Sequence, residues 1–235
     1  MTDLVYLRDA QLTSLESVVT AVDDSRVELD ATVFYVLGGG QPADVGTLSW
    51  IDGEAAVTDV RKKEGTVWHH LDGPIPAVGT TVTGTIDGER RQQLMRTHSA
   101  MHVLGGVVYN RYGVTSTGNN MEPLKARIDF DFGTLPEGFA EDVTAAVNAE
   151  IAADRPIEVS FLPRNTAVED ADLLRTKVNL IPESVKEIRV VDIVGLDKQA
   201  DGGTHVDSTG EIGHFEITKT ESKGGGNKRV RFVLS

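Results

Sequence analysis

Apolar and polar residues alternate along the first third of the chain, in the two-residue period that is typical of half-buried β-strands. The alternating segments are separated by strong turn signals at Asp52-Gly53, Asp72-Gly73-Pro74 and Asp87-Gly88. We therefore expect short strands at residues 27–36, 47–53, 55–60, 66–71 and 81–86. Many short strands joined by glycine-rich turns predict a small barrel or sandwich that ends near residue 88.

The hydrophobic period then changes to that of a helix. Apolar residues recur at helical spacing from residue 89, and Gly113 is a suitable C-cap, so a helix is predicted over 89–112. Gly105 and Gly106 lower the helix propensity of this segment, and they favour close packing of a neighbouring element.

The rest of the chain mixes both periods. We expect helices over 137–154 and 168–176, and strands over 126–132, 157–162, 188–194, 212–219 and 228–234 that complete one sheet. The fold class is therefore α+β. A small, barrel-like β-module over residues 1–88 is followed over 89–235 by a two-layer domain of helices and sheet.

Composition places the chain among ordinary globular proteins. Its 235 residues are 40% apolar and 25% charged, and no apolar run is long enough to span a membrane. The first residues, Met1 to Tyr6, are too acidic for a signal peptide. The chain has no cysteine, which excludes disulfides, Cys-rich zinc sites and thiol nucleophiles. These features favour a cytoplasmic protein.

The charge balance is strongly acidic. Lys and Arg total 23 against 36 Asp and Glu, a net charge of −13. Such a surface repels nucleic acid at low salt. Phosphate contacts would then depend on local basic clusters, which lie at 61–63, 90–96 and 223–231. The alternatives for the acidic excess are a surface kept for solubility and an origin in a salt-loving organism.

Two short motifs far apart in the sequence carry candidate metal ligands. His98 and His102 lie at i and i+4 of the predicted helix, so both imidazoles share one face with Cβ atoms about 5–6 Å apart. Asp201 and His205 have the same spacing around a Gly-Gly turn, which can fold them toward one point. Together they match the ligand set of a tetrahedral zinc site. The alternatives are a helix-surface or core histidine pair and a plain glycine turn.

Three further histidines stay outside this set. His69 and His70 are adjacent in a predicted strand, so their side chains point to opposite faces of it. His214 is assigned a structural role.

A family resemblance rests on these same motifs. The stretch from His98 to His102, and Gly202 to Gly213 with its Gly-Gly-Thr-His and Thr-Gly-Glu-Ile-Gly segments, resemble the editing domain of alanyl-tRNA synthetase and its freestanding relatives, the AlaX proteins. The glycine-rich stretch Gly38 to Gly46 is similar to a motif of the larger AlaX proteins. The resemblance covers nearly the whole chain. The length leaves no room for an aminoacylation domain, so the resemblance implies a freestanding editor.

The resemblance implies a trans-editing hydrolase that deacylates tRNA(Ala) mischarged with serine, with glycine as a second candidate. Zinc would be held by His98, His102, Asp201 and His205. Zinc can polarise an ester carbonyl or activate water. No Ser-His-Asp or Cys-His nucleophile is apparent, so direct attack by water is expected. The alternatives are a non-catalytic tRNA-binding protein with a degenerate metal site and a zinc hydrolase of small acyl esters.

One ligand departs from the family pattern, because Asp201 stands where the motif has cysteine. Three interpretations follow. Asp201 can bind zinc directly as a harder ligand, which we prefer because the spacing to His205 is kept. It can instead orient a water molecule or His205 without touching the metal, or its presence can weaken metal binding. If all four side chains bind at once, the site must expand its coordination or release a ligand to admit water.

Substrate contacts are assigned to two polar loops. By resemblance, Thr115 is the residue that senses the serine hydroxyl, since a group that pairs with this hydroxyl discriminates against alanine. Gly39, Gly40 and Gln41 are assigned to the acceptor end of the tRNA. The alternatives are an ordinary polar loop and a glycine-rich turn of the β-module.

Overall fold

The structure, a computed structural model, describes residues 1–170, 172–173, 181, 183–224 and 226–235. The chain divides into two compact units, Met1–Gln92 and Gln93–Ser235. The boundary between them falls inside α1 (Gly88–Tyr112).

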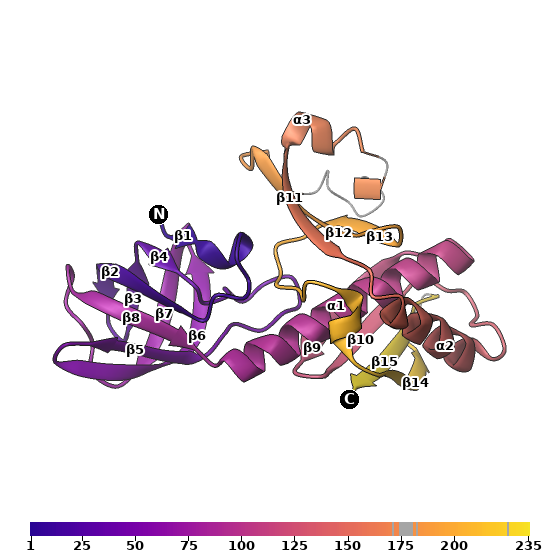
Figure 1. Cartoon of the computed structure of the whole chain (residues 1–235), viewed down its shortest axis with the longest axis horizontal. Coiled ribbons are helices and arrows are strands. Elements are labelled where there is room, and N and C mark those ends of the chain that lie inside the picture. The colour runs from indigo at the N-terminus through magenta and orange to yellow at the C-terminus, as the bar shows by residue number, and fades with distance from the viewer. Residues whose placement is uncertain (171, 174–180, 182, 225) are drawn as a thin grey trace. The chain divides into compact units, whose positions relative to one another are not determined.

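The first unit is a closed six-stranded barrel with the strand order β2-β3-β7-β6-β5-β8 (Figure 1). All neighbouring strands in it are antiparallel. Its strands are β2 (Ser14–Asp23), β3 (Arg26–Leu29), β5 (Gly46–Trp50), β6 (Gly53–Lys63), β7 (Thr66–Asp72) and β8 (Thr81–Ile86). A parallel pair of short strands, β1 (Asp3–Leu4) and β4 (Ala31–Thr32), lies outside the barrel order.

The alternating sequence pattern builds the barrel core. In β8 every second residue is buried, and the same alternation in β3 buries Val27 and Leu29. His69 points inward as well, where its Nε2 lies 2.8 Å from Thr32 Oγ1, whereas His70 is only half-buried. The two adjacent histidines therefore face opposite sides of β7, as predicted.

The predicted strand over 27–36 is interrupted. The Asp30 carboxylate accepts hydrogen bonds from Val18 N–H (2.8 Å) and from its neighbour Ala31 (2.9 Å), so a side chain replaces the strand ladder here. The apolar run that follows is buried without being a strand, and Phe34 is a fully buried part of the core. This run is apolar because its side chains pack in the hydrophobic core of the first unit.

A buried ion pair holds the long connection between β4 and β5. Arg91 and Asp44 form a salt bridge with 2% and 1% of their side chains exposed. Arg91 also donates to the Val33 carbonyl (2.7 Å) and the Ala10 carbonyl (2.8 Å). The Asp44 carboxylate accepts from Tyr35 N–H at 2.7 Å. Both ends of the glycine-rich loop are thus attached to one guanidinium group.

In the part of the chain that the structure describes, the second unit has two antiparallel sheets and three α-helices. The four-stranded sheet has the order β14-β15-β10-β9 and the three-stranded sheet the order β11-β12-β13. The strands are β9 (Ser116–Glu122), β10 (Lys125–Phe130), β11 (Ile157–Pro163), β12 (Glu187–Ile193), β13 (Asp197–Ala200), β14 (Phe215–Ser222) and β15 (Lys228–Leu234). The helices are α1, α2 (Phe139–Ala152) and α3 (Arg164–Ala167). Within the described residues, no helix combines the length and apolarity needed to cross a membrane.

Helix α2 packs on the four-stranded sheet. The Asn148 side chain donates to the Phe215 carbonyl (2.7 Å) and accepts from Phe215 N–H (3.0 Å). Helix α1 is tied to the β9–β10 turn, where Thr97 Oγ1 accepts from Leu124 N–H at 2.9 Å. Helices that cover sheets confirm the α+β class, but the strands form two sheets where one was predicted.

Other element predictions differ in detail. Strand β9 lies where a polar loop was predicted. It is an edge strand that is almost entirely polar and buries only Met121, so its sequence lacks the apolar alternation of a strand. Strand β14 begins at Phe215, since a short 3-10 helix (Thr209–Ile212) and Gly213 at φ 87° precede it. Helix α3 lies before the helix predicted over 168–176, of which residues 171 and 174–176 fall outside the described residues.

We expect Asp44→Ala to destabilise the barrel by about 3–5 kcal/mol, because it leaves the Arg91 charge buried and uncompensated. Removing both charges with Asp44→Leu and Arg91→Met should cost clearly less. Both tryptophans, Trp50 and Trp68, lie in this unit, so urea unfolding followed by tryptophan fluorescence reports on it. A double variant as unstable as Asp44→Ala would contradict this account.

Burial lowers the pKa of His69 to about 4, from 6.5. The unfolded chain therefore binds a proton that the folded barrel excludes, and stability falls as the pH drops from 6.5 toward 4. This histidine should account for a loss of about 2 kcal/mol between pH 7 and pH 5. In urea titrations His69→Gln should flatten the dependence on pH, while His70→Gln on the opposite face should not.

Candidate metal centre

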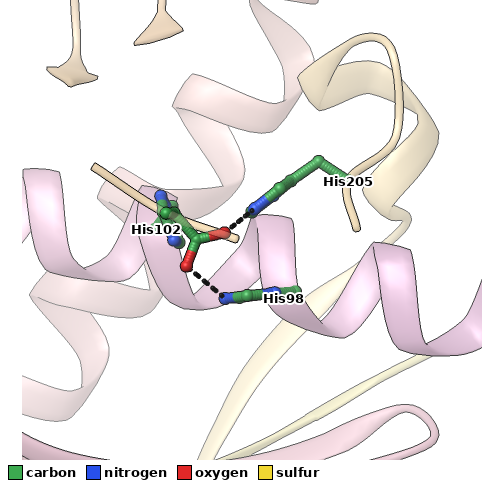
Figure 2. Close-up of side chains that lie close together, drawn as sticks. His98, His102 and His205 are labelled. Atoms are coloured by element: carbon green, nitrogen blue, oxygen red, sulfur yellow. Dashed lines mark hydrogen bonds and ion pairs between the residues drawn. The ribbon is translucent and has the colours of Figure 1, made fainter. Parts of the chain in front are cut away.

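Helix α1 and the chain after β13 bring four candidate ligands together. His98, His102, Asp201 and His205 each offer a donor atom, and these atoms all lie within 4.8 Å of one another. The imidazole centroids are 4.4 Å apart for His98 and His205 and 4.6 Å apart for His102 and His205. Figure 2 shows the rings of His98 and His205 directed at opposite oxygens of one carboxylate, which is that of Asp201. The predicted cluster therefore forms.

The turn that follows β13 sets the position of the carboxylate. Asp201 Oδ2 accepts from Gly203 N–H at 2.6 Å and lies 3.1 Å from His205 Nε2. Asp201 Oδ1 lies 3.7 Å from His98 Nε2. A Cβ on Gly203 would collide with the His98 ring at Cε1 and Nδ1. The second glycine of the turn is needed because the ring packs directly on its backbone.

Residues around the cluster orient its members. Ser99 Oγ lies 3.1 Å from His205 Nδ1 and accepts from Val206 N–H at 3.3 Å. Arg189 is buried and donates to the Asp201 carbonyl at 2.8 Å, with the same nitrogen 3.9 Å from Asp201 Oδ2. These contacts hold the ring of His205 and the backbone at Asp201.

Burial decides the protonation of the cluster. It lowers the pKa of His98 well below 6.5 and that of His205 to about 4, although Asp201 opposes both shifts. Burial opposes ionisation of Asp201 too, but His98 and the hydrogen bond with His205 hold the pKa of this carboxyl well below its usual range. At neutral pH His98 and His205 therefore offer uncharged imidazoles beside a carboxylate, which is the protonation state that binds a metal.

The donor chemistry fits a divalent transition metal. Imidazole and carboxylate ligands suit zinc, and four ligands are the usual number for it. His102 Nδ1 is buried and has no hydrogen-bond partner among the described residues. Three imidazoles and one carboxylate, with donor atoms within 4.8 Å of one another, are a donor set that such an ion can bind.

The predicted substrate residues lie in both units. Gly39 and Gly40 adopt positive φ values of 60° and 88°, and the backbones of Gly38 and Gln41 pair at 2.9 and 3.2 Å. The Gln41 side chain is 1% exposed, so it is buried within the first unit. Thr115, in the second unit, is half-buried just before β9 and is not part of the four-residue cluster.

Several arginines of the predicted basic clusters serve the fold instead. Arg91 is buried against Asp44, and Arg90 donates to the Ala43 carbonyl at 2.8 Å. Arg96 donates to the Ile212 carbonyl at 2.9 Å. The cluster at 90–96 is therefore largely occupied by contacts within the protein.

Three neighbours of the cluster were missed by sequence reasoning. Ser99 stands between the two motif histidines, and its position could have been noticed. Arg189 in β12 and Asp197 in β13 shortly precede Asp201 in the sequence, but no pattern links them to the histidines of α1. The only signal for Asp197 was the predicted close packing at Gly106.

Comparisons with known proteins match both units. Residues 188–231 match the family model described as "Threonyl and Alanyl tRNA synthetase second additional domain", and residues 5–90 match "tRNA synthetases class II (A)". An alanyl-tRNA editing protein AlaX-M of Methanosarcina barkeri is 36% identical over 241 residues, which cover 100% of this chain and 99% of the relative. The chain belongs to the AlaX-M family of alanyl-tRNA editing proteins. The family resemblance predicted from the motifs is confirmed.

Other relatives of this AlaX-M family member divide into two kinds. The AlaX-M protein of Saccharolobus solfataricus is 37% identical over 244 residues, again covering 100% of this chain and 99% of the relative. The alanine–tRNA ligase of Methanopyrus kandleri is 38% identical over 213 residues, which are 89% of this chain but 23% of the ligase. The AlaX-M chain thus corresponds to one part of the much longer ligase.

We expect Gly203→Ala to disrupt the cluster, because the added Cβ displaces the His98 ring. Zinc affinity, measured by competition with a chromophoric chelator, should fall at least about tenfold. Gly202→Ala is the matched control, since a Cβ there meets no atom within 4 Å. Equal losses of zinc affinity in the two variants would mean that the turn needs the backbone flexibility of both glycines. The contact between Gly203 and the His98 ring would then be unimportant.

Proposed function

We propose that this chain hydrolyses the ester bond of tRNA(Ala) mischarged with serine, and also with glycine, using zinc held by His98, His102, Asp201 and His205. The observation that carries the proposal is the convergence of these four buried or half-buried side chains within 4.8 Å, in a chain that aligns with AlaX-M proteins over its full length. An intact ligand cluster favours an enzyme over a binding protein with a degenerate site.

The ligand set carries the right charge for this role. As metal ligands the three imidazoles are neutral, so with the Asp201 carboxylate they bear one negative charge, as they would with a cysteine thiolate in place of Asp201. The aspartate therefore preserves the electrostatics of the family motif while offering a harder oxygen donor. This supports direct binding by Asp201, the first of the three interpretations.

Hydrogen bonding by Ser99 supports one tautomer of His205. For His205 Nε2 to present a lone pair, its Nδ1 must hold the proton, and Ser99 Oγ lies 3.1 Å from Nδ1 as an acceptor. Ser99 thereby orients the ring and keeps Nε2 available beside Asp201. The low pKa of His205 keeps this ring neutral at physiological pH.

The reaction breaks one ester bond. When bound, zinc supplies the Lewis acidity that activates water and polarises the ester carbonyl. Water adds to the carbonyl carbon, the terminal ribose hydroxyl leaves with a proton, and the products are free amino acid and tRNA. Asp201, held ionised by its surroundings, keeps its charge for binding the metal, and the proton that water loses is taken up by the leaving ribose oxygen.

Discrimination against correctly charged alanine requires a group that pairs with the serine hydroxyl. A site that hydrogen-bonds this hydroxyl leaves a buried polar group unpaired when alanine is bound. We assign this role to Thr115, whose backbone is fixed where its carbonyl accepts from Asp131 N–H at 3.4 Å. Glycine lacks this hydroxyl as alanine does, so its hydrolysis would depend on a contact other than that of Thr115.

The tRNA contacts are assigned to the remaining basic residues and the glycine-rich loop. Lys62, Lys63 and Lys223 are exposed. Gly39 and Gly40 present backbone to solvent, whereas Gln41 would have to leave its buried position to touch the acceptor end. With a net charge of −13, binding depends on how salt screens the acidic surface and weakens the phosphate contacts.

The test is release of labelled serine from Ser-tRNA(Ala) by sub-stoichiometric zinc-loaded protein, with Ala-tRNA(Ala) as the comparison. Serine should be released in multiple turnovers and alanine left largely intact. Thr115→Val should narrow the serine-to-alanine rate ratio, and His102→Ala should abolish hydrolysis of both. Asp201→Cys is the control that keeps activity, because a thiolate supplies the same ligand charge.

Two outcomes would contradict the proposal. Binding of zinc and tRNA without turnover would favour the tRNA-binding alternative. Rapid hydrolysis of small acyl esters, with no preference for aminoacyl-tRNA, would favour a general esterase.

A further inference from the structure

The second ring nitrogen of His102 has no hydrogen-bond partner in the described part of the chain. This nitrogen, Nδ1, is buried, and a buried polar atom without a hydrogen bond destabilises the fold. The facing carboxylate is that of Asp197, whose Oδ2 lies 4.0 Å from His102 Nδ1 and whose side chain is 0% exposed. Two buried groups that complement each other chemically thus face each other without touching.

The Asp197 carboxylate is itself oriented. Asp197 begins β13, where it pairs with Ile193 of β12. Gln199 Nε2 donates to Asp197 Oδ2 at 2.6 Å. The carboxylate therefore has a defined direction, with one oxygen toward the amide of Gln199 and the ring of His102.

One face of α1 is shaped to admit this carboxylate. His102, Gly106 and Asn110 follow each other at i, i+4 and i+8, so they form one stripe along the helix. A Cβ on Gly106 would lie 2.9 Å from Asp197 Cβ, and Asn110 Nδ2 donates to the Leu196 carbonyl at 3.2 Å. The missing side chain at Gly106 lets the β12–β13 turn approach the helix directly beside His102.

We infer that Asp197 is a positioning residue for His102, an inference that rests on the proposed metal site. Asp197 accepts the Nδ1 proton of His102, which fixes the tautomer with the lone pair on Nε2. Because the two ring nitrogens point in different directions, a ring with Nδ1 toward Asp197 directs Nε2 away from it, to the other ligands. The 4.0 Å separation is about 1 Å longer than a hydrogen bond, a gap that a small side-chain rotation closes.

This contact completes a pattern in the site. His205 is oriented through its Nδ1 by Ser99. His102 is oriented in the same way by Asp197, with a charged acceptor in place of a hydroxyl. A carboxylate that hydrogen-bonds a metal-bound histidine raises the basicity of the ligand, and its loss typically lowers metal affinity about 10–100-fold.

The experiment measures zinc affinity of the full-length chain by competition with a chromophoric chelator, and the visible absorption spectrum of the Co²⁺-substituted protein. Asp197→Ala should weaken zinc binding about 10–100-fold and alter the Co²⁺ bands. Asp197→Asn keeps an oxygen that can accept the Nδ1 proton, so it should fall between Asp197→Ala and wild type. Lost packing alone would not lower the zinc affinity of Asp197→Asn below that of wild type, because asparagine and aspartate have nearly the same shape.

Asp192→Asn is the matched control. It removes a carboxylate from the neighbouring strand β12, whose charge interacts with Lys198, with Glu158 and with Asp197 itself. It should leave zinc affinity within about twofold and the Co²⁺ spectrum unchanged. An equal loss in this control would overturn the inference in favour of a long-range charge effect.

Two further outcomes are decisive. Asp197 variants that bind zinc like wild type, with one zinc per chain in both, would overturn the role of Asp197 while leaving the proposed function standing. A wild-type chain that binds no zinc would overturn both. Circular dichroism of each variant, compared with wild type, separates these results from unfolding.

Discussion

The second unit depends on the gathering of four polar side chains at one place inside the protein. His98, His102 and His205 are buried beside the half-buried Asp201, and burial drives the pKa values of His98 and His205 below 6.5. Neutral imidazoles beside an ionised carboxylate are costly to bury unless something else satisfies them. A divalent cation satisfies all of them at once. The site therefore makes sense as a metal centre, and the same requirement explains why its neighbours are so closely constrained.

Absent side chains are as important to this centre as the ligands. Gly203 lets the His98 ring pack on the turn that carries Asp201 and His205. Gly106 lets the β12–β13 turn approach α1 beside His102. In both places a single methyl group would occupy space that another atom already fills. The glycines thus set the distance between the helix and the segments that complete the site.

Several arginines of this protein are bound by its own carboxylates and carbonyls. Arg91, Arg96 and Arg189 all bind carboxylates or carbonyls of the chain itself, and Arg229 pairs with Asp129 at 2.7 Å. The pairs Arg91–Asp44 and Arg229–Asp129 each remove one charge of either sign, so the rest of the chain keeps the acidic excess of the composition. A tRNA partner must therefore be bound against this excess of negative charge.

The sequence alone determined the class of fold, the barrel strands β3, β5, β6, β7 and β8, the helix α1 and the four candidate ligands, but it missed the barrel strand β2. These features are local, since a strand or helix period and an i, i+4 pair can be seen within one short segment. It could not separate a buried apolar connection from a strand at Val33 to Val36, nor recognise the polar edge strand β9, because burial depends on distant neighbours. Only the tertiary structure brought Asp197 behind His102, Ser99 against His205 and Arg91 against Asp44. Each of these contacts joins residues that are far apart in the chain. Tertiary packing therefore decides them, and no local sequence pattern predicts them.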